Sequence, residues 1–200
     1  MLDAKSEEVL RLITKLGVVR PMDLVSYGVS RVQLRHLLQN NLIEKMSRGI
    51  YHVVDANISE YHSLAEASKK VPNGVVCLLS ALRYHDLTTQ NPFEVWMAIG
   101  AKSHLPKAHE QGVRFYRFST LTLEYGVVEQ VVEGVRVRIF DPAKTVADCF
   151  KYRNKIGTDI ALEALRDCWR QRKATMDELW LAAKVCRVAN VMRPYMESLV

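Results

Sequence analysis

The 200-residue sequence lacks the cysteine and repeat patterns that mark several protein classes. Its four cysteines form no C-x-x-C pair, so the sequence predicts neither a zinc ribbon nor a redox dithiol. We expect Cys77, Cys149, Cys168 and Cys186 to be reduced and mostly buried thiols. The sequence shows no internal repeat and no low-complexity segment.

The sequence also lacks a long hydrophobic run. No segment contains the roughly 18 uninterrupted apolar residues that a membrane-spanning helix requires. The N-terminal stretch MLDAKSEEVLRLI carries acidic residues before any apolar run, and it has no small-residue cleavage pattern. The sequence therefore predicts a cytoplasmic protein without a membrane partner.

Patterns typical of catalysis or metal binding are scarce. The nearest pair of metal ligands is His104 with His109, in an expected loop that offers no third ligand nearby. His85 and Asp86 are adjacent, but consecutive residues on a helix or turn diverge, so they do not predict an orienting pair. No serine or cysteine stands in a nucleophile motif. We expect no metal, no cofactor and no enzymatic activity.

Basic residues are in mild excess. The chain has 28 Lys and Arg against 22 Asp and Glu, which gives a formal net charge of +6. This excess favours a polyanionic partner without proving one. A hydrophobic content of 48% is enough to form a real core, and the length is compatible with one domain or two.

The first 54 residues predict three short helices followed by a hairpin. Capping residues and hydrophobic spacing place the helices at 6–16, 21–27 and 30–40. Alternating apolar residues then predict strands at 42–46 and 50–54. Helices and a hairpin in this order make a winged helix-turn-helix.

The third helix and the hairpin turn carry the candidate site. With the leucines of this helix pointing inward, we expect its polar side to lie in the major groove of DNA, where Arg31, Gln33 and Arg35 would read bases. Lys45 and Arg48 would reach the DNA backbone or minor groove from the hairpin. The full set of candidate DNA-binding residues is Ser30, Arg31, Gln33, Arg35, His36, Lys45, Ser47 and Arg48.

The distribution of charge helps to decide whether this segment binds DNA or another protein. Between residues 30 and 54 there are four basic residues and one acidic residue, Glu44, whereas residues 1–29 are balanced. Concentrated basic charge on the expected reading surface favours DNA binding. A winged helix that binds another protein is the alternative.

A second domain is expected after a boundary near residue 56. The predicted domains are 1–56, which binds DNA, and 57–200, a mixed α+β domain. Helices are predicted at 61–71 and 80–85, and strands at 93–99, 113–118 and 127–140, the last folded about Glu133 and Gly134. From residue 141 the chain is predicted to be helical, with a break at Gly157 and a capping box at Thr175.

Three lysines in the first of these C-terminal helices form a second candidate site. Lys144, Lys151 and Lys155 are spaced by seven and four residues, which places them on one side of the helix with Asp148 between them. Such a stripe is either a solvated face or a basic contact surface for nucleic acid or an acidic protein.

The order of motifs resembles the AbiEi family of antitoxins, which belong to bacterial type IV toxin-antitoxin (abortive infection) systems of phage defence. The resemblance spans nearly the whole chain and rests on three segments. They are GVVRPMDLVSYGVSRVQLRHLLQNNLIEKMSRGIYHV, then LLSALRYHDLTTQNPFEVWMAI, and finally VRIFDPAKTVADCFKYRNKIG followed by ALEALRDCWRQRKAT. The first segment alone is generic, whereas the three in this order are fairly specific.

The resemblance implies more about function than residue spacing and charge do, since these support only DNA binding. It implies a winged-helix domain that binds operator DNA and represses its own operon, joined to a C-terminal antitoxin domain. It also implies a nucleotidyltransferase-like toxin of the AbiEii type, which is counteracted without a stable complex. A stand-alone winged-helix regulator without a toxin partner would have the same sequence features.

Overall fold

The computed structural model describes residues 4–54, 59–105 and 112–199. The chain forms two compact units, Met1–Pro72 with Val131–Val137 and Asn73–Gln130 with Arg138–Val200. We call them the N-terminal unit and the C-terminal unit. Helices and strands occur in both units, so the mixed α+β class predicted from the sequence is confirmed.

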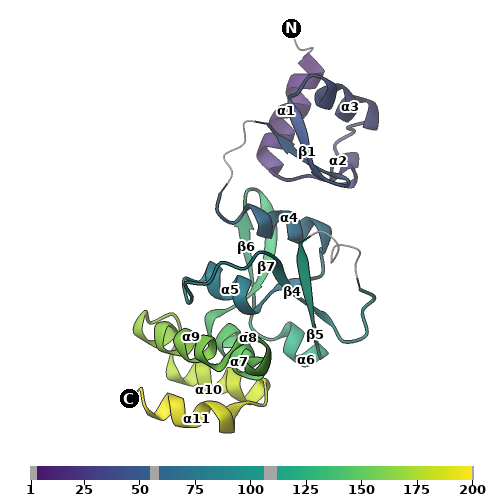
Figure 1. Cartoon of the computed structure of the whole chain (residues 1–200). Coiled ribbons are helices and arrows are strands. Elements are labelled where there is room, and N and C mark those ends of the chain that lie inside the picture. The colour runs from purple at the N-terminus through teal and green to yellow at the C-terminus, as the bar shows by residue number, and fades with distance from the viewer. Residues whose placement is uncertain (1–3, 55–58, 106–111, 200) are drawn as a thin grey trace. The chain divides into compact units, whose positions relative to one another are not determined.

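The N-terminal unit begins with three helices and a hairpin, in the predicted order (Figure 1). Its elements are α1 (Ala4–Leu16), α2 (Pro21–Val25), α3 (Arg31–Gln39), β1 (Ile43–Ser47), β2 (Ile50–Val53) and α4 (His62–Lys70). The strands β1 and β2 pair antiparallel, with Ile43 opposite Val53. An isolated bridge between Val19 and Tyr51 ties the segment before α2 to β2.

One apolar cluster holds these elements together. Buried side chains from α1, α2, α3 and β1 form it: Val9, Ile13, Val19, Leu24, Val29, Leu34, Leu37 and Ile43. The helices contribute residues at three- and four-residue spacing, as expected for short helices that bury one face. Burial of this face fixes which side of α3 remains in water.

The N-terminal unit continues beyond the hairpin. Asp23 of α2 accepts a hydrogen bond from the Lys69 ammonium of α4 at 2.7 Å. Partial burial opposes ionisation of Asp23, but hydrogen bonds from Lys69 and Arg20 outweigh it and lower the pKa of this carboxyl. The predicted boundary at residue 56 lies outside the described residues, and the division of activities at that point stays a prediction.

Most of a mixed five-stranded sheet lies in the C-terminal unit, and residues 131–137 of its last two strands belong to the N-terminal unit. The strand order is β5 (Val113–Phe118), β4 (Val95–Gly100), β3 (Val75–Val76), β7 (Val135–Phe140) and β6 (Val127–Val132). β3 pairs antiparallel with β4 and parallel with β7, and β4 pairs parallel with β5. The chain between these strands also forms α5 (Leu78–Tyr84) and α6 (Thr120–Glu124).

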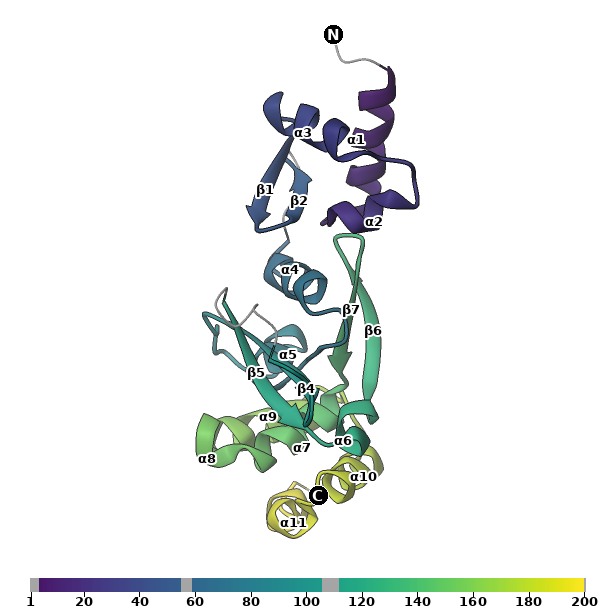
Figure 2. The ribbon, with the colours of Figure 1, turned by 90° about the vertical axis from the view of Figure 1, so that its right-hand side faces the viewer.

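The helices after β7 gather around α7 (Figure 2). They are α7 (Pro142–Lys151), α8 (Arg153–Ile156), α9 (Thr158–Arg170), α10 (Met176–Val185) and α11 (Ala189–Glu197). α7 contacts α5, α8, α9, α10 and α11, and it is buried from Ala143 to Phe150. The four cysteines are free and buried, which confirms the prediction for them.

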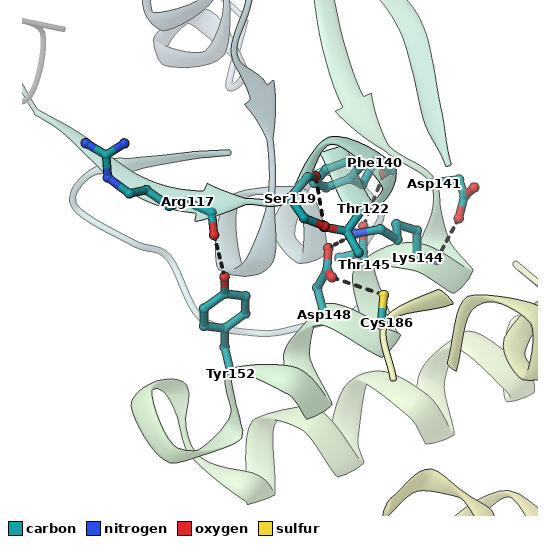
Figure 3. A network of polar contacts seen from close by, with 10 residues as sticks. All are labelled: Arg117, Ser119, Thr122, Phe140, Asp141, Lys144, Thr145, Asp148, Tyr152 and Cys186. Carbon is teal, nitrogen blue, oxygen red and sulfur yellow. Dashed lines mark hydrogen bonds and ion pairs between the residues drawn. The ribbon is translucent and has the colours of Figure 1, made fainter. Parts of the chain in front are cut away.

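The structure corrects the prediction for Lys144. Its side chain is fully buried and forms an ion pair with Asp148 one helical turn later (Figure 3). The Lys144 ammonium also lies 4.0 Å from the centre of the Phe140 ring. Lys144 is therefore part of the interior, because its neighbours on α7 are all buried, whereas Lys151 and Lys155 are exposed.

The carboxyl of Asp148 has an unusually high pKa. Burial raises its pKa to about 6, although the Lys144 ammonium and the Cys186 thiol, whose Sγ lies 3.3 Å from Asp148 Oδ1, favour the ionised form. Because this pKa is above the unfolded value, the folded state holds the proton more tightly. The contribution of Asp148 to stability therefore falls as the pH rises from about 4 to about 6.

We predict that Lys144→Met destabilises the protein by about 3–5 kcal/mol, because it leaves a buried carboxylate without its partner. Lys151→Met should change the free energy of unfolding by less than about 0.5 kcal/mol, since that lysine is exposed. Urea unfolding at several pH values measures both. The loss for Lys144→Met should grow above pH 6, where Asp148 ionises; equal, pH-independent losses for both variants would contradict the buried pair.

Candidate nucleic-acid interface

The start of α3 is fixed by a reciprocal cap. The Ser30 hydroxyl accepts a hydrogen bond from the Gln33 backbone N–H at 3.2 Å. The Gln33 side-chain oxygen in turn accepts from the Ser30 N–H at 2.8 Å and from its hydroxyl at 3.0 Å. This capping box satisfies N–H groups that the first turn leaves unpaired. The Ser30 and Gln33 side chains thus fix the position of α3, while Gln33 was predicted to read bases.

The exposed side of α3 carries its charge. Leu34 and Leu37 are buried, whereas Arg31 and Arg35 are exposed. In the described parts of the chain neither arginine forms an ion pair with a carboxylate. His36 is also exposed, and its ring nitrogen Nε2 lies 3.3 Å from Asn40 Nδ2. The guanidinium groups of α3 are therefore available to an anionic partner.

A hollow of about 320 Å³ lies along one flank of α3. Its walls come from α2, α3 and β2, and its lining residues are Pro21, Arg31, Leu34, Arg35, Leu38 and Tyr51. Both arginines thus border a concave surface, in which charge is concentrated next to low-dielectric walls.

The hairpin adds further basic side chains. Ser47 pairs with Ile50 across a two-residue turn of Arg48 and Gly49, where Gly49 has φ +76°. Lys45 and Arg48 are exposed, and the buried Ser47 hydroxyl has no hydrogen-bond partner among the described residues.

Glu44, the acidic residue of the hairpin, is engaged within the sheet. Its Oε1 lies 2.9 Å from Nε2 of the buried His52 on the opposite strand. Glu44 thus has its own neighbour inside the hairpin, and the turn beyond it presents only basic charge.

The C-terminal unit has a hollow of its own, with a volume of about 290 Å³. Lys151 of α7 and Arg187 after α10 line it, together with hydroxyl groups of Ser119 and Thr122. Neither cation forms an ion pair within the described residues. The Tyr152 hydroxyl on its wall donates a hydrogen bond to the Arg117 carbonyl at 3.1 Å (Figure 3).

Other predicted residues lie apart from this hollow. The Lys155 ammonium lies 5.9 Å from the ring centres of both Tyr116 and Tyr152. Neither Lys155 nor Lys144 lines the hollow, and Lys144 is buried in its pair with Asp148. Sequence spacing thus grouped three lysines that occupy three environments, and it missed Arg187, which lies on a different helix end.

Among the described residues, no three His, Cys, Asp or Glu side chains are grouped as a metal site would need; His109 lies outside those residues. None of the described helices has the length and apolar character required to cross a membrane.

A basic helix face beside a basic hairpin is typical of DNA-binding regulators. In agreement, residues 7–54 match the family model described as "Transcriptional regulator, AbiEi antitoxin". The resemblance to the AbiEi family stated from the sequence is thereby confirmed over the three helices and the hairpin.

The fold of the whole chain is also similar to a solved structure. The chain is similar to the crystal structure of the RV2827C protein from Mycobacterium tuberculosis, with a TM-score of 0.60 and 12% sequence identity. The alignment covers 100% of this chain and 81% of that one. At this identity the likeness concerns the fold alone. No curated protein matches the sequence.

We predict that Ser30→Ala lowers the free energy of unfolding by about 1 kcal/mol, because it removes the cap of α3. Gln33→Glu should remain close to the unaltered protein, since glutamate can form the same capping box. Gln33→Ala should lose part of that stability. Thermal unfolding of the three variants measures this; stability unchanged by both alanine substitutions would exclude a capping role.

Proposed function

We propose that this protein is a type IV antitoxin that binds operator DNA through a winged helix formed by α1–α3 with β1 and β2. It represses its own operon, and its C-terminal unit counteracts an AbiEii-type nucleotidyltransferase toxin without forming a stable complex. The observation that carries the proposal is the pair of unpartnered arginines on the exposed face of α3, within the segment that matches the AbiEi model.

The arginines suit base recognition for a chemical reason. An α-helix fits the major groove, where a guanidinium group can form two hydrogen bonds with the acceptor edge of guanine. Arg31 and Arg35 are exposed on one side of a helix whose opposite side is fixed in the core. His36 would lie at the edge of the same surface.

The hairpin would position the protein on the DNA. Lys45 and Arg48 are exposed near the turn and would contact phosphates or the minor groove, which adds affinity without sequence information. The Ser47 hydroxyl is buried at this turn, so Ser47 would support the turn and not contact DNA itself. Ser30 and Gln33 would act indirectly, by holding the first turn of α3 in place.

For the antitoxin activity we propose the hollow of the C-terminal unit as the contact surface. Lys151 and Arg187 bring unpaired positive charge to it, and Lys155 adds charge nearby on α8. Lys144 does not belong to this surface, because it is buried with Asp148. The surface would act on an anionic group, such as the toxin's nucleic-acid substrate or an acidic region of the toxin.

Binding to DNA is tested with a duplex selected from random sequences. We predict that Arg31→Ala or Arg35→Ala weakens binding to the selected site by about 1–3 kcal/mol and affects random DNA less. Lys15→Ala is the matched control, since Lys15 is an exposed cation on α1. Gel-shift titrations measure the affinities. Equal losses on selected and random DNA would remove the base-reading role.

Repression and protection should be separable in the full-length chain. We predict that Arg31→Ala/Arg35→Ala abolishes promoter repression but still protects cells when expressed from an unrelated promoter. Lys151→Ala/Arg187→Ala should do the reverse, and Lys184→Ala, an exposed cation on α10 outside the hollow, should change neither.

The assay first requires a nucleotidyltransferase-like gene next to this one. It then co-expresses that toxin and scores growth, protein level and repression separately. Loss of protection in the repression-dead variant at normal protein level would contradict the division of labour. If no such neighbouring gene exists, the stand-alone regulator becomes the better account.

A further inference from the structure

One apolar side chain stands in the middle of the proposed DNA-binding face. Val32, the second residue of α3, exposes 75% of its surface. Other exposed apolar side chains occur nearby in sequence, including Val25 at 61%, but these precede α3. Single exposed apolar residues are common on protein surfaces, so exposure alone implies nothing. The position of Val32 on the helix is more informative.

Helix geometry places Val32 opposite the core. Successive residues of an α-helix are rotated by about 100°, so Val32 lies about 160° around the axis from Leu34 and about 140° from Leu37. Both leucines are buried in the N-terminal core. Val32 therefore projects further from the core than either arginine. With α3 in the major groove of DNA, Val32 would face the base edges at the bottom of the groove.

The arginines lie on one side of Val32. By the same rotation, Arg35 is about 60° from Val32 and Arg31 about 100°. Gln39, which is exposed, lies about 20° away and about two turns further along the helix. A helix that brings Arg35 to a base edge consequently brings Val32 to a neighbouring base.

We propose that Val32 is a specificity-determining residue that contacts the 5-methyl group of a thymine in the major groove, an inference that rests on the proposed DNA binding. A valine side chain has no polar atom, so it can form a hydrogen bond neither with a phosphate nor with a base. The thymine methyl is the apolar group that the major groove presents. The branched Val32 side chain is also held in one main rotamer within a helix, which gives the contact a fixed position.

The charge around Val32 argues for DNA over a protein partner. Arg31, Arg35 and His36 surround it on the exposed face, and no carboxylate of α3 offsets them. A polyanion compensates this charge, whereas an apolar protein surface would leave the guanidinium groups desolvated. The selected DNA site should accordingly contain a thymine next to the guanine bound by Arg35.

The test replaces each thymine of the selected duplex in turn by deoxyuridine, which removes only the methyl group. The unaltered protein should lose about three- to fourfold in affinity at one thymine of each bound site, the value expected for one buried methyl group. Val32→Ala should bind the thymine and deoxyuridine duplexes equally at that position. Such a cycle isolates the contact between the two groups.

Val25→Ala is the matched control, because Val25 is an exposed valine of α2 outside the α3 face. It should keep the full sensitivity to deoxyuridine. Both valines are exposed, so both variants should fold as the unaltered protein does. Val32→Thr, which retains one methyl group, should keep part of the sensitivity.

Two results would overturn the proposal. One is tight, selective binding of the thymine duplex whose affinity is unchanged by deoxyuridine at every position. The other is a deoxyuridine effect that persists unchanged in Val32→Ala. Absence of any sequence preference would instead overturn the base-reading function itself, so the two failures are distinguishable. Capture of an apolar peptide by Val32 in place of DNA would also count against the thymine contact.

Discussion

Burial of Leu34 and Leu37 is the constraint on which the proposed DNA-binding surface depends. These leucines anchor α3 in the small N-terminal core, so the direction of every other side chain of the helix follows from the helical rotation. The core has few members, and loss of one large side chain would leave a cavity that costs several kcal/mol. The orientation of the arginines thus depends on buried residues of the core.

Polar residues in this protein have two different uses. Ser30 and Gln33 bond to each other at the start of α3, and Glu44 contacts His52 across the hairpin. These groups hold the structure, and their neighbours satisfy them. Arg31 and Arg35 have no such neighbours within the described residues, and that difference separates the proposed binding residues from the structural ones.

Sequence reasoning recovered most elements of the N-terminal unit because capping residues and leucine spacing are local signals. Strand Val113–Phe118 and the turn at Glu133 were also predicted correctly. α6 was missed because it has only five residues, whereas α11, which contains Pro194, lies in the stretch from residue 141 that was predicted to be helical. Local patterns could not show that the N-terminal unit includes residues 131–137, since that depends on tertiary contacts.

The candidate sites show the same limit. Exposure of Arg31 and Arg35 followed from the inward leucines, and this expectation is confirmed. A lysine four residues before an aspartate reads as an exposed pair, and only the packing of α7 shows that Lys144 and Asp148 are interior. Val32 was not among the predicted binding residues because an apolar residue in a helix is usually assigned to the core. Its angle on the helix, however, places it opposite the core.

The most direct measurement of the central claim is an amide NMR titration of the full-length protein with its selected DNA duplex. The account predicts that the largest perturbations map to α3, Arg31–Gln39, and to the hairpin turn at Arg48 and Gly49. Amides on the outer side of α1 should change little. Perturbations confined to the C-terminal unit, with α3 unaffected, would contradict the assignment of DNA binding to this helix.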